Sequence, residues 1–233
     1  MARSESESHA ETSTGRLNGS SYNTTSEQAQ LRPGSRWLDV YVMLDAMGVG
    51  VQGGGIGSVG VGGLLLDGGF SPYLYERGLA TDDIQKLEVV LANGEIIEAS
   101  ATQNEDLYQV LKGGGGGFGI VTRYDMETFA RKPIWSAYRE YPEDANADEA
   151  HILGLKHWTD NPEVYDSGSA FIWWTYRPAA EQTIIISSLA DTAGQAGPSA
   201  FKELLSILGY NVSSIGLTNM STSAQATQAS GYR

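Results

Sequence analysis

The 233-residue chain contains no cysteine. It therefore has no disulfide bond, no thiolate metal ligand, no cysteine nucleophile and no cofactor attached through sulfur. It also lacks an apolar run approaching the ~20 residues of a membrane-spanning helix. The first residues, MARSESESHAETSTG, do not show the basic-then-apolar order of a signal peptide. From these absences we expect a protein without a membrane span or leader, cytoplasmic by default.

Basic residues are scarce as well. Lysine and arginine total 15 against 28 aspartates and glutamates, which gives a net charge of −13. A protein of this sign is repelled by the phosphate backbone of nucleic acid and by the anionic inner leaflet of a membrane. We therefore expect neither nucleic acid nor membrane as a partner, and the composition leaves the oligomeric state open.

Large apolar residues are concentrated in the middle of the chain. Residues 1–30 are rich in Ser, Glu, Thr, Asn and Gln, and such a segment cannot bury enough apolar surface to offset the entropy of ordering. We predict a disordered arm there and, on similar composition, a flexible tail over 211–233. The folded units are expected at 31–130 and 134–210, divided near Lys132-Pro133.

Three local patterns predict elements of the first unit. A helix that ends at Gly48 is predicted from apolar residues at i, i+3, i+4 spacing, namely Trp37, Val40, Tyr41, Leu44 and Met47. The runs KLEVVLA and EIIEAS flank Asn93-Gly94, a dipeptide that favours the type I′ turn of a β-hairpin. A short amphipathic helix over 104–112 and the strand-like run FGIVTRYDMETF follow.

The second unit alternates strand-like and helical patterns. The runs IWSAYREYP, SAFIWWTYR and TIIISSLA indicate strands, and 148–158 and 199–208 indicate helices. This order predicts an α+β layer with helices on one face of an antiparallel sheet. Trp173, Trp174 and Tyr176 could either line a substrate pocket or pack in the sheet core, and packing is the commoner role for such residues.

No metal site is indicated. His151 and His157 lie six positions apart on a predicted helix, so they face different directions and cannot share one zinc ion in the i, i+4 register. Such histidines are normally solvent-exposed or satisfied by hydrogen bonds. No Ser-His-Asp spacing stands out either, so the catalytic residues remain unknown from the sequence.

Fourteen of the 29 glycines lie in two clusters, from Gly53 to Gly69 and from Gly113 to Gly117. Backbone N–H groups freed of side-chain bulk can converge on an anion, although glycines also serve ordinary tight turns. Gly55-x-Gly57-x-x-Gly60 and a second match at Gly114 fit the dinucleotide spacing, but no amphipathic helix is predicted after either. The first cluster is too rich in glycine for a stable helix, so we expect a loop.

A longer pattern is more specific. From about Pro33 to Phe129 the order is a glycine loop, Gly-Leu-Ala-x-Asp, a hairpin, a helix and a glycine-rich Phe-Gly-Ile-Val. This order resembles the second half of the FAD-binding domain of the berberine-bridge-enzyme-like, PCMH-type flavin oxidoreductases, above all the fungal FAD-linked oxidoreductases. The second unit resembles the start of that family's substrate domain, with an antiparallel sheet.

The resemblance implies an FAD-dependent oxidoreductase of secondary metabolism that oxidises a small-molecule substrate and passes electrons to oxygen. Ile56 occupies the position at which some members carry a cysteine bonded to the flavin, so FAD would be held non-covalently here. The residues that the resemblance assigns to the cofactor are Gly60, Val61, Gly62, Gly63, Leu64, Phe70, Gly116 and Val121.

The chain departs from the family pattern in three places. The polar arm stands where members have a first FAD-binding half with a Gly-Gly-His segment, and the chain stops before the stretch that often supplies a catalytic tyrosine. Gly117 replaces the usual asparagine before Phe-Gly. The resemblance thus predicts a partial chain, and the alternative function is a truncated, non-catalytic member that binds FAD weakly or not at all.

Overall fold

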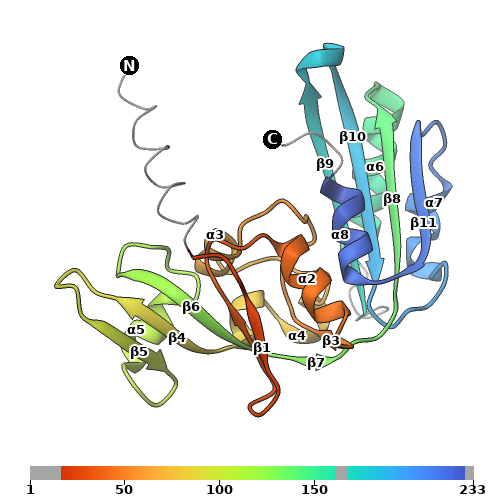
Figure 1. The fold of residues 1–233 in the computed structure, drawn as a ribbon. Coiled ribbons are helices and arrows are strands. Elements are labelled where there is room, and N and C mark those ends of the chain that lie inside the picture. The colour runs from red at the N-terminus through yellow and green to blue at the C-terminus, as the bar shows by residue number, and fades with distance from the viewer. Residues whose placement is uncertain (1–16, 161–166, 229–233) are drawn as a thin grey trace, which may run out of the picture. The chain divides into compact units, whose positions relative to one another are not determined.

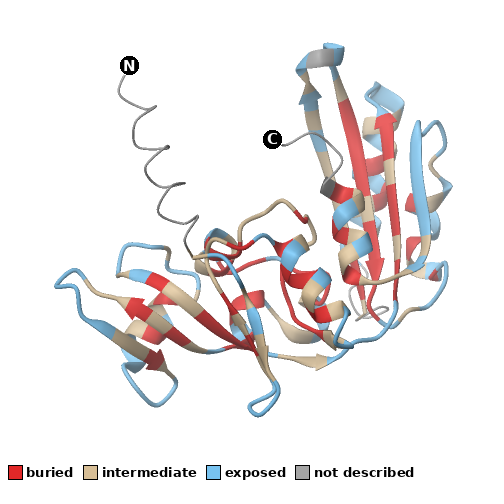
Figure 2. Ribbon diagram, viewed as in Figure 1, coloured by how far each residue is buried: buried red, intermediate tan, exposed pale blue. Residues whose placement is uncertain are grey.

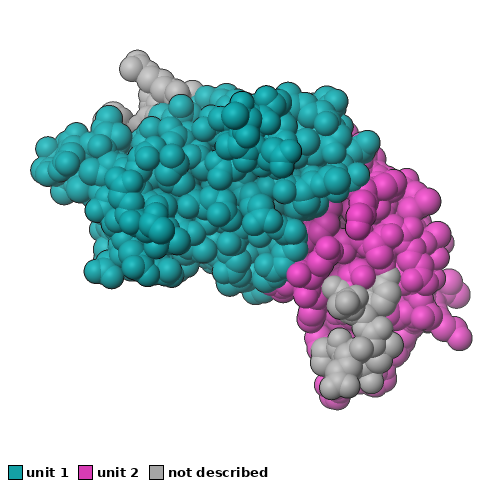
Figure 3. All heavy atoms as spheres, turned by 90° about the horizontal axis from the view of Figure 1, so that it is seen from below, with its two compact units in different colours: residues 1–71, 77–131 teal, residues 72–76, 132–233 magenta. Residues whose placement is uncertain are grey.

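The computed structural model describes residues 17–160 and 167–228. They divide into two compact units, drawn in different colours in Figure 3. Unit 1 comprises residues 1–71 and 77–131, and unit 2 comprises residues 72–76 and 132–233. Within the described ranges, no helix has the length and apolar character needed to cross a membrane.

Unit 1 is built on an antiparallel five-stranded sheet with the order β1-β2-β6-β4-β5 (Figure 1). The hairpin predicted at Asn93-Gly94 is present, with Val90 opposite Ile96. Its turn is not of type I′, because Gly94 has a φ of +83° whereas the φ of Asn93 is not positive. The strands are β1 (Ser21–Asn23), β2 (Gln28–Leu31), β4 (Ile84–Val90), β5 (Ile96–Ser100) and β6 (Ile120–Glu127). A separate pair is formed by β3 (Val49–Gly50) and β7 (Phe129–Ala130).

Two helices of unit 1 follow the apolar periodicity of the sequence. Helix α2 (Trp37–Asp45) buries Trp37, Val40, Tyr41 and Leu44, as predicted, whereas Met47 lies beyond its end and is exposed. Helix α5 (Glu105–Leu111) matches the second predicted helix. The remaining helical turns of unit 1 are α3 (Val61–Leu66) and η1 (Ala80–Asp83), whereas α4 (Leu74–Arg77) belongs to unit 2 except for Arg77.

The prediction of a disordered arm over 1–30 is wrong for the strands β1 and β2. Strand β2 pairs with β6 along its whole length, from Gln28 opposite Glu127 to Leu31 opposite Tyr124. Its alternation buries Ala29 and Leu31 and leaves both glutamines half-buried. Two buried apolar residues are enough to hold this strand, because backbone hydrogen bonds to β6 supply the remaining stabilisation. The composition of the segment therefore gave no sign of a strand. Residues 1–16 lie outside the described residues.

Unit 2 contains an antiparallel four-stranded sheet with the order β11-β8-β10-β9. Its strands are β8 (Ile134–Pro142), β9 (Gly168–Arg177), β10 (Gln182–Asp191) and β11 (Val212–Thr218). Helices α6 (Ala145–Thr159) and α7 (Lys202–Ser206) cover one face, with the turns η3 (Pro178–Ala180) and η4 (Ser199–Phe201) beside the strands. Helix α8 (Met220–Gln228) covers the other face (Figure 1).

The predicted flexible tail over 211–233 is wrong for β11 and α8. Every residue of β11 from Val212 to Thr218 pairs with β8, so backbone hydrogen bonds hold a segment whose side chains are largely exposed. Helix α8 buries only Met220, Ala224 and Thr227 among its described side chains. Residues 229–233 lie outside the described residues.

One apolar cluster of unit 2 lies between the sheet and helices α6 and α7, and a second, formed by Tyr138, Ile184 and Ile186, packs with Ala226 of α8 on the other face. The buried residues are coloured red in Figure 2. Trp135, Ala137 and Leu189 of the sheet pack against Phe201 and Leu204. The rings of Trp135 and Phe201 stack with their centroids 6.0 Å apart. This face of the sheet is therefore closed by large side chains.

His151 lies in that layer and is fully buried, whereas His157 is exposed beside Glu203. The Nδ1 atom of His151 is 2.7 Å from the Ala147 carbonyl oxygen, and its Nε2 atom has no hydrogen-bond partner among the described residues. Burial lowers the pKa of His151 and outweighs the opposite effects of Ala147 and Asp148. The folded protein thus holds this ring neutral.

We expect unit 2 to lose stability as the pH falls below about 6.5, the ordinary histidine pKa. In that range His151 is protonated in the unfolded chain but not in the folded chain, so acid favours unfolding. The ring of His151 lies against that of Tyr141, with the centroids 4.4 Å apart. The variant His151→Phe keeps a ring there and should flatten this dependence, measured as urea unfolding between pH 5 and 7.5. His157→Gln is the exposed control. A wild-type slope in His151→Phe would contradict the assignment.

Candidate functional site

The two glycine clusters lie side by side in unit 1. The Gly115 N–H group donates a hydrogen bond to the Leu66 carbonyl oxygen at 3.0 Å. A Cβ atom built on Gly113 would lie 3.7 Å from the Gly68 nitrogen, and one built on Gly116 would lie 3.8 Å from Leu66 Cδ1. The C-terminal end of α3 therefore adjoins the second cluster, and one ligand can touch both.

Helix α3 itself contradicts the prediction of a loop without helix. The Val61 N–H group donates to the Ser35 carbonyl at 3.0 Å, and the Gly62 N–H group donates to the Pro33 carbonyl at 3.2 Å. Val61 and Leu65 are fully buried. Tertiary contacts thus hold a turn that glycine would not form alone, which sequence propensity could not show.

Several glycines of the first cluster serve the packing of the protein. A Cβ atom on Gly53 would lie 2.1 Å from the Trp37 ring, and one on Gly54 would lie 2.7 Å from Leu64. On Gly62 it would lie 2.9 Å from Pro33 Cβ. These positions require glycine because another part of the chain already occupies the space.

Other glycines face open space. No atom of the chain's described part lies within 4 Å of a Cβ built on Gly63 or Gly117, and at Gly60 the nearest is Arg36 Nη1 at 3.6 Å. Gly63, Gly116 and Gly117 are exposed. A ligand can therefore approach the main chain here without displacing protein atoms, which is what a cofactor held by backbone requires.

Arg36 brings the positive charge closest to this open main chain. Its Nη1 atom donates to the Ser58 carbonyl at 3.0 Å, which holds the guanidinium against the loop. Within the described ranges it has no carboxylate partner, whereas the side chains of Arg32, Arg77, Arg123, Arg131 and Arg177 all do. Sequence reasoning missed Arg36, because neither its contact with Gly60 nor its lack of a carboxylate partner among the described residues can be read from the neighbouring sequence.

Two buried polar atoms beside the loop also lack partners among the described residues. They are Trp37 Nε1 and Gln52 Oε1, although Gln52 Nε2 donates to the Gly78 carbonyl at 2.9 Å. An unsatisfied buried polar group costs about 1–3 kcal/mol. The loop thus keeps a donor and an acceptor available, and with the open glycines this fits a polar, extended cofactor.

The remaining predicted site residues are placed differently. Phe70 is 63% exposed, and Leu64 is half-buried beside Gly54 and Gly69. Val121 is buried in β6 opposite Val89. The described contacts place Gly116 beside Leu66, at the end of the helix that follows Gly60, but they do not bring Val121 to either.

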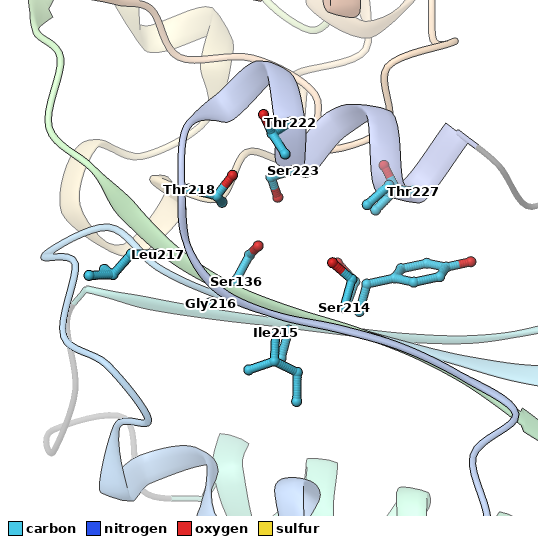
Figure 4. Close-up of a pocket in the computed structure, with 13 residues that line it drawn as sticks. Ser136, Ser214, Ile215, Gly216, Leu217, Thr218, Thr222, Ser223 and Thr227 are labelled. Atoms are coloured by element: carbon cyan, nitrogen blue, oxygen red, sulfur yellow. The ribbon is translucent and has the colours of Figure 1, made fainter.

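Unit 2 contains a cavity of about 190 Å³ between α8 and the strands β8, β10 and β11 (Figure 4). The three aromatic residues considered for a substrate pocket are not among its lining. Trp173 packs with Ile184 and Ile186, Trp174 Nε1 donates to Asp148 at 2.7 Å, and Tyr176 is exposed. The packing interpretation is thus correct for Trp173. No group of three or more potential metal ligands occurs among the described residues.

Sequence comparison links this geometry to flavoproteins. The family model for an FAD binding domain matches residues 12–100. The FAD-dependent monooxygenase drtC of Aspergillus calidoustus is 36% identical over 199 residues, which cover 85% of this chain and 37% of that protein. The FAD-dependent monooxygenase sdcF of Emericella nidulans is 34% identical over 219 residues, which cover 93% of this chain and 45% of that protein.

Solved structures show the same fold. The xylooligosaccharide oxidase of Myceliophthora thermophila C1 superposes with a TM-score of 0.71 at 28% identity, covering 94% of this chain and 46% of that chain. The 6-hydroxy-D-nicotine oxidase of Arthrobacter nicotinovorans superposes with a TM-score of 0.73 at 19% identity, covering 93% and 48%, and supports the fold alone. The chain spans less than half the length of these relatives.

The fold is therefore α+β, the second half of a PCMH-type FAD-binding domain followed by part of a substrate domain with an antiparallel sheet. Its cofactor is FAD. Within this class the chain is a partial-length relative of the fungal, berberine-bridge-enzyme-like FAD-linked oxidoreductases, as the sequence pattern predicted.

Proposed function

We propose that this chain carries the cofactor-contacting half of an FAD-dependent oxidoreductase that oxidises a small organic molecule in fungal secondary metabolism, with oxygen accepting the electrons. This proposal rests on one observation, the row formed by Arg36, Gly60, Gly63 and Gly116. Gly60 precedes α3, and Gly116 adjoins its last residue, Leu66. At ~1.5 Å per residue the row extends about 9 Å, which suits one stretch of an elongated cofactor such as FAD, with its central pyrophosphate at the Arg36 end.

The residues act in different ways in this proposal. Gly60, Gly63 and Gly116 allow the cofactor to approach the main chain, and Leu64 and Phe70 offer apolar surface beside it. Val61, Gly62 and Val121 support the site from within, since the Gly62 N–H group is already used by Pro33. Arg36 would place its charge near a phosphate. Bound FAD supplies the capacity to accept a hydride.

The proposal is tested by titrating the full chain with FAD and following flavin fluorescence. The variant Arg36→Gln should weaken FAD binding about threefold to tenfold, a range reduced for the exposure of this side chain. It should leave the binding of riboflavin, which has no phosphate, unchanged. Arg32→Gln is the matched control, because Arg32 is occupied by Glu88 and the Thr122 carbonyl. Equal losses in the two variants would exclude a phosphate contact at Arg36.

The alternative is a truncated, non-catalytic family member that binds FAD weakly or not at all. This alternative is favoured by the partial coverage of the relatives, since the chain matches 37% of the length of drtC and 45% of the length of sdcF. The visible absorption spectrum of the chain, purified with excess FAD and then desalted, separates the two. Retained flavin bands support the oxidoreductase, and acid precipitation should then release the flavin into the supernatant, because the sequence contains neither a cysteine nor the Gly-Gly-His segment that would attach it. A colourless protein supports the alternative.

A further inference from the structure

The sheet of unit 2 has two edge strands, β9 and β11, and β11 is the less protected of them. Within residues 17–160 and 167–228, β11 pairs with β8 alone, so the backbone groups on its outer side have no partner strand. Its register with β8 runs without interruption from Val212 to Thr218. Edge strands of soluble proteins are usually guarded by lysine, proline or a β-bulge. Strand β11 has none of these three features, so its edge is open to another strand.

Exposed apolar side chains lie along this strand, which is largely pale blue in Figure 2. Ile215 is 45% exposed and Leu217 is 60% exposed. They lie opposite Ala137 and Trp135 of β8, so they share the face of the sheet that packs against α6 and α7. In agreement, Figure 4 shows the Ile215 side chain pointing away from α8. The apolar layer of unit 2 therefore continues to the edge of the sheet, where these two side chains are left exposed.

The charge pattern favours a second copy of this chain as the partner. Each copy carries a net charge of −13, so two copies repel each other wherever their charged surfaces meet. No charged residue occurs between Glu203 and Arg233, a stretch that includes all of β11 and α8. At the other edge, by contrast, Trp174 of β9 donates to the Asp148 carboxylate, and the strand ends at Arg177. Two copies can thus approach each other at β11 with the least repulsion.

We propose that β11 pairs antiparallel with β11 of a second copy, so that two four-stranded sheets join into one continuous sheet. A two-fold axis makes such an interface self-complementary, because each copy offers the same strand. Ile215 is the middle residue of β11, so pairing centred there uses all seven residues of the strand. It places Ile215 opposite Ile215 of the second copy, and Leu217 opposite Ser213. Both exposed apolar side chains thereby gain a neighbour on their own face of the sheet.

The size of this interface predicts a weak dimer. A strand of seven residues extends about 24 Å. Pairing along one strand buries less than the ~1,600 Å² of a standard interface, so the dimer should dissociate on dilution. Because β11 is uncharged and the two copies carry like charges, added salt should strengthen the association. An interface held by ion pairs would respond in the opposite way.

The first experiment is sedimentation velocity of the full chain over roughly 1–300 μM, the range in which a weak complex forms. The monomer should give way to a dimer as the concentration rises. Ile215→Lys should weaken this association more than tenfold, because the two-fold axis brings the two lysines face to face. Tyr176→Lys on β9, where the side chain is 60% exposed, is the matched control and should dimerise like the wild type. Thermal unfolding checks that both variants fold.

The second experiment uses the absence of cysteine, since a single introduced thiol then reports the geometry. In Ile215→Cys the two thiols face each other at the ~4.5–5.5 Å Cβ spacing of directly opposed residues. This spacing approaches the ~3.5–4.5 Å of a disulfide. Mild oxidation with diamide should therefore give a covalent dimer on a non-reducing gel. Leu153→Cys on α6, where the side chain is 42% exposed, is the control and should stay monomeric.

Three results would overturn the proposal. The first is a monomer at the highest concentration. The second is an equal loss of association in Ile215→Lys and Tyr176→Lys, which would place the contact elsewhere. The third is equal cross-linking of Ile215→Cys and Leu153→Cys, which would indicate random collision. None of these results bears on FAD binding in unit 1, so this proposal and the flavin proposal fail separately.

Discussion

Gly62→Val is expected to lower the free energy of unfolding of unit 1 by about 1–3 kcal/mol, the usual range for overpacking. The first atom of the new side chain would lie 2.9 Å from Pro33 Cβ and 3.2 Å from the Pro33 carbonyl oxygen. The proline ring and its backbone cannot move away cheaply. Urea unfolding monitored by circular dichroism measures the loss.

The neighbouring variant Gly63→Val is the matched control. It is expected to keep its stability and to lose FAD binding. Its side chain would enter open space, and replacing glycine within a helix costs no stability. It should fold like the wild type and yet abolish FAD binding, because the valine would occupy the space proposed for the cofactor. Unchanged FAD affinity in a folded Gly63→Val protein would show that the glycine loop is not the site. Wild-type stability in Gly62→Val would contradict the packing at Pro33.

Arg123→Leu is expected to destabilise unit 1 by about 3–5 kcal/mol, because it leaves a buried carboxylate without its main partner. The Asp125 side chain is only 3% exposed, and Arg123 Nε lies 2.8 Å from its Oδ1 atom. The remaining cation, Lys86 Nζ, is 3.9 Å from Oδ2. Arg123 also pairs with Glu88 at 2.8 Å, so one guanidinium holds two strands of the sheet.

The double variant Arg123→Leu/Asp125→Asn should recover part of that loss, since the amide carries no charge to bury. Lys156→Ala provides the comparison with an exposed ion pair, Lys156 with Asp160, for which at most about 1 kcal/mol is expected. Chemical denaturation of all three variants measures these differences in the free energy of unfolding. An Arg123→Leu effect as small as that of Lys156→Ala would show that water reaches Asp125.

Elements with a strong local signal were predictable from the sequence. Asn93-Gly94 fixes its hairpin through the turn it forms, and the apolar spacing from Trp37 to Leu44 defines α2. The segments β2, α3 and β11 were missed, because partners distant in the sequence hold them rather than their own residues. Pro33 and Ser35 clamp α3, and β8 holds β11 by its backbone.

The candidate site divides in the same way. The family pattern identified the glycine loop, but it could not separate Gly62, which packs on Pro33, from Gly63, which is open. That difference depends on which side of α3 faces the preceding chain. Likewise, nothing near Arg36 in the sequence shows that, among the described residues, it lacks a carboxylate partner while most other arginines have one.

The strand order β1-β2-β6-β4-β5 has a consequence for how unit 1 folds during synthesis. Strand β6 lies between β2 and β4 and pairs with both. The β4–β5 hairpin can form from local contacts, whereas β2 finds its partner only after nearly all of unit 1 has left the ribosome. Closing so long a loop is entropically slow. Until Glu127 emerges, the β1–β2 hairpin has an unpaired edge, and that edge is where a nascent chain of this protein is most exposed to misassociation.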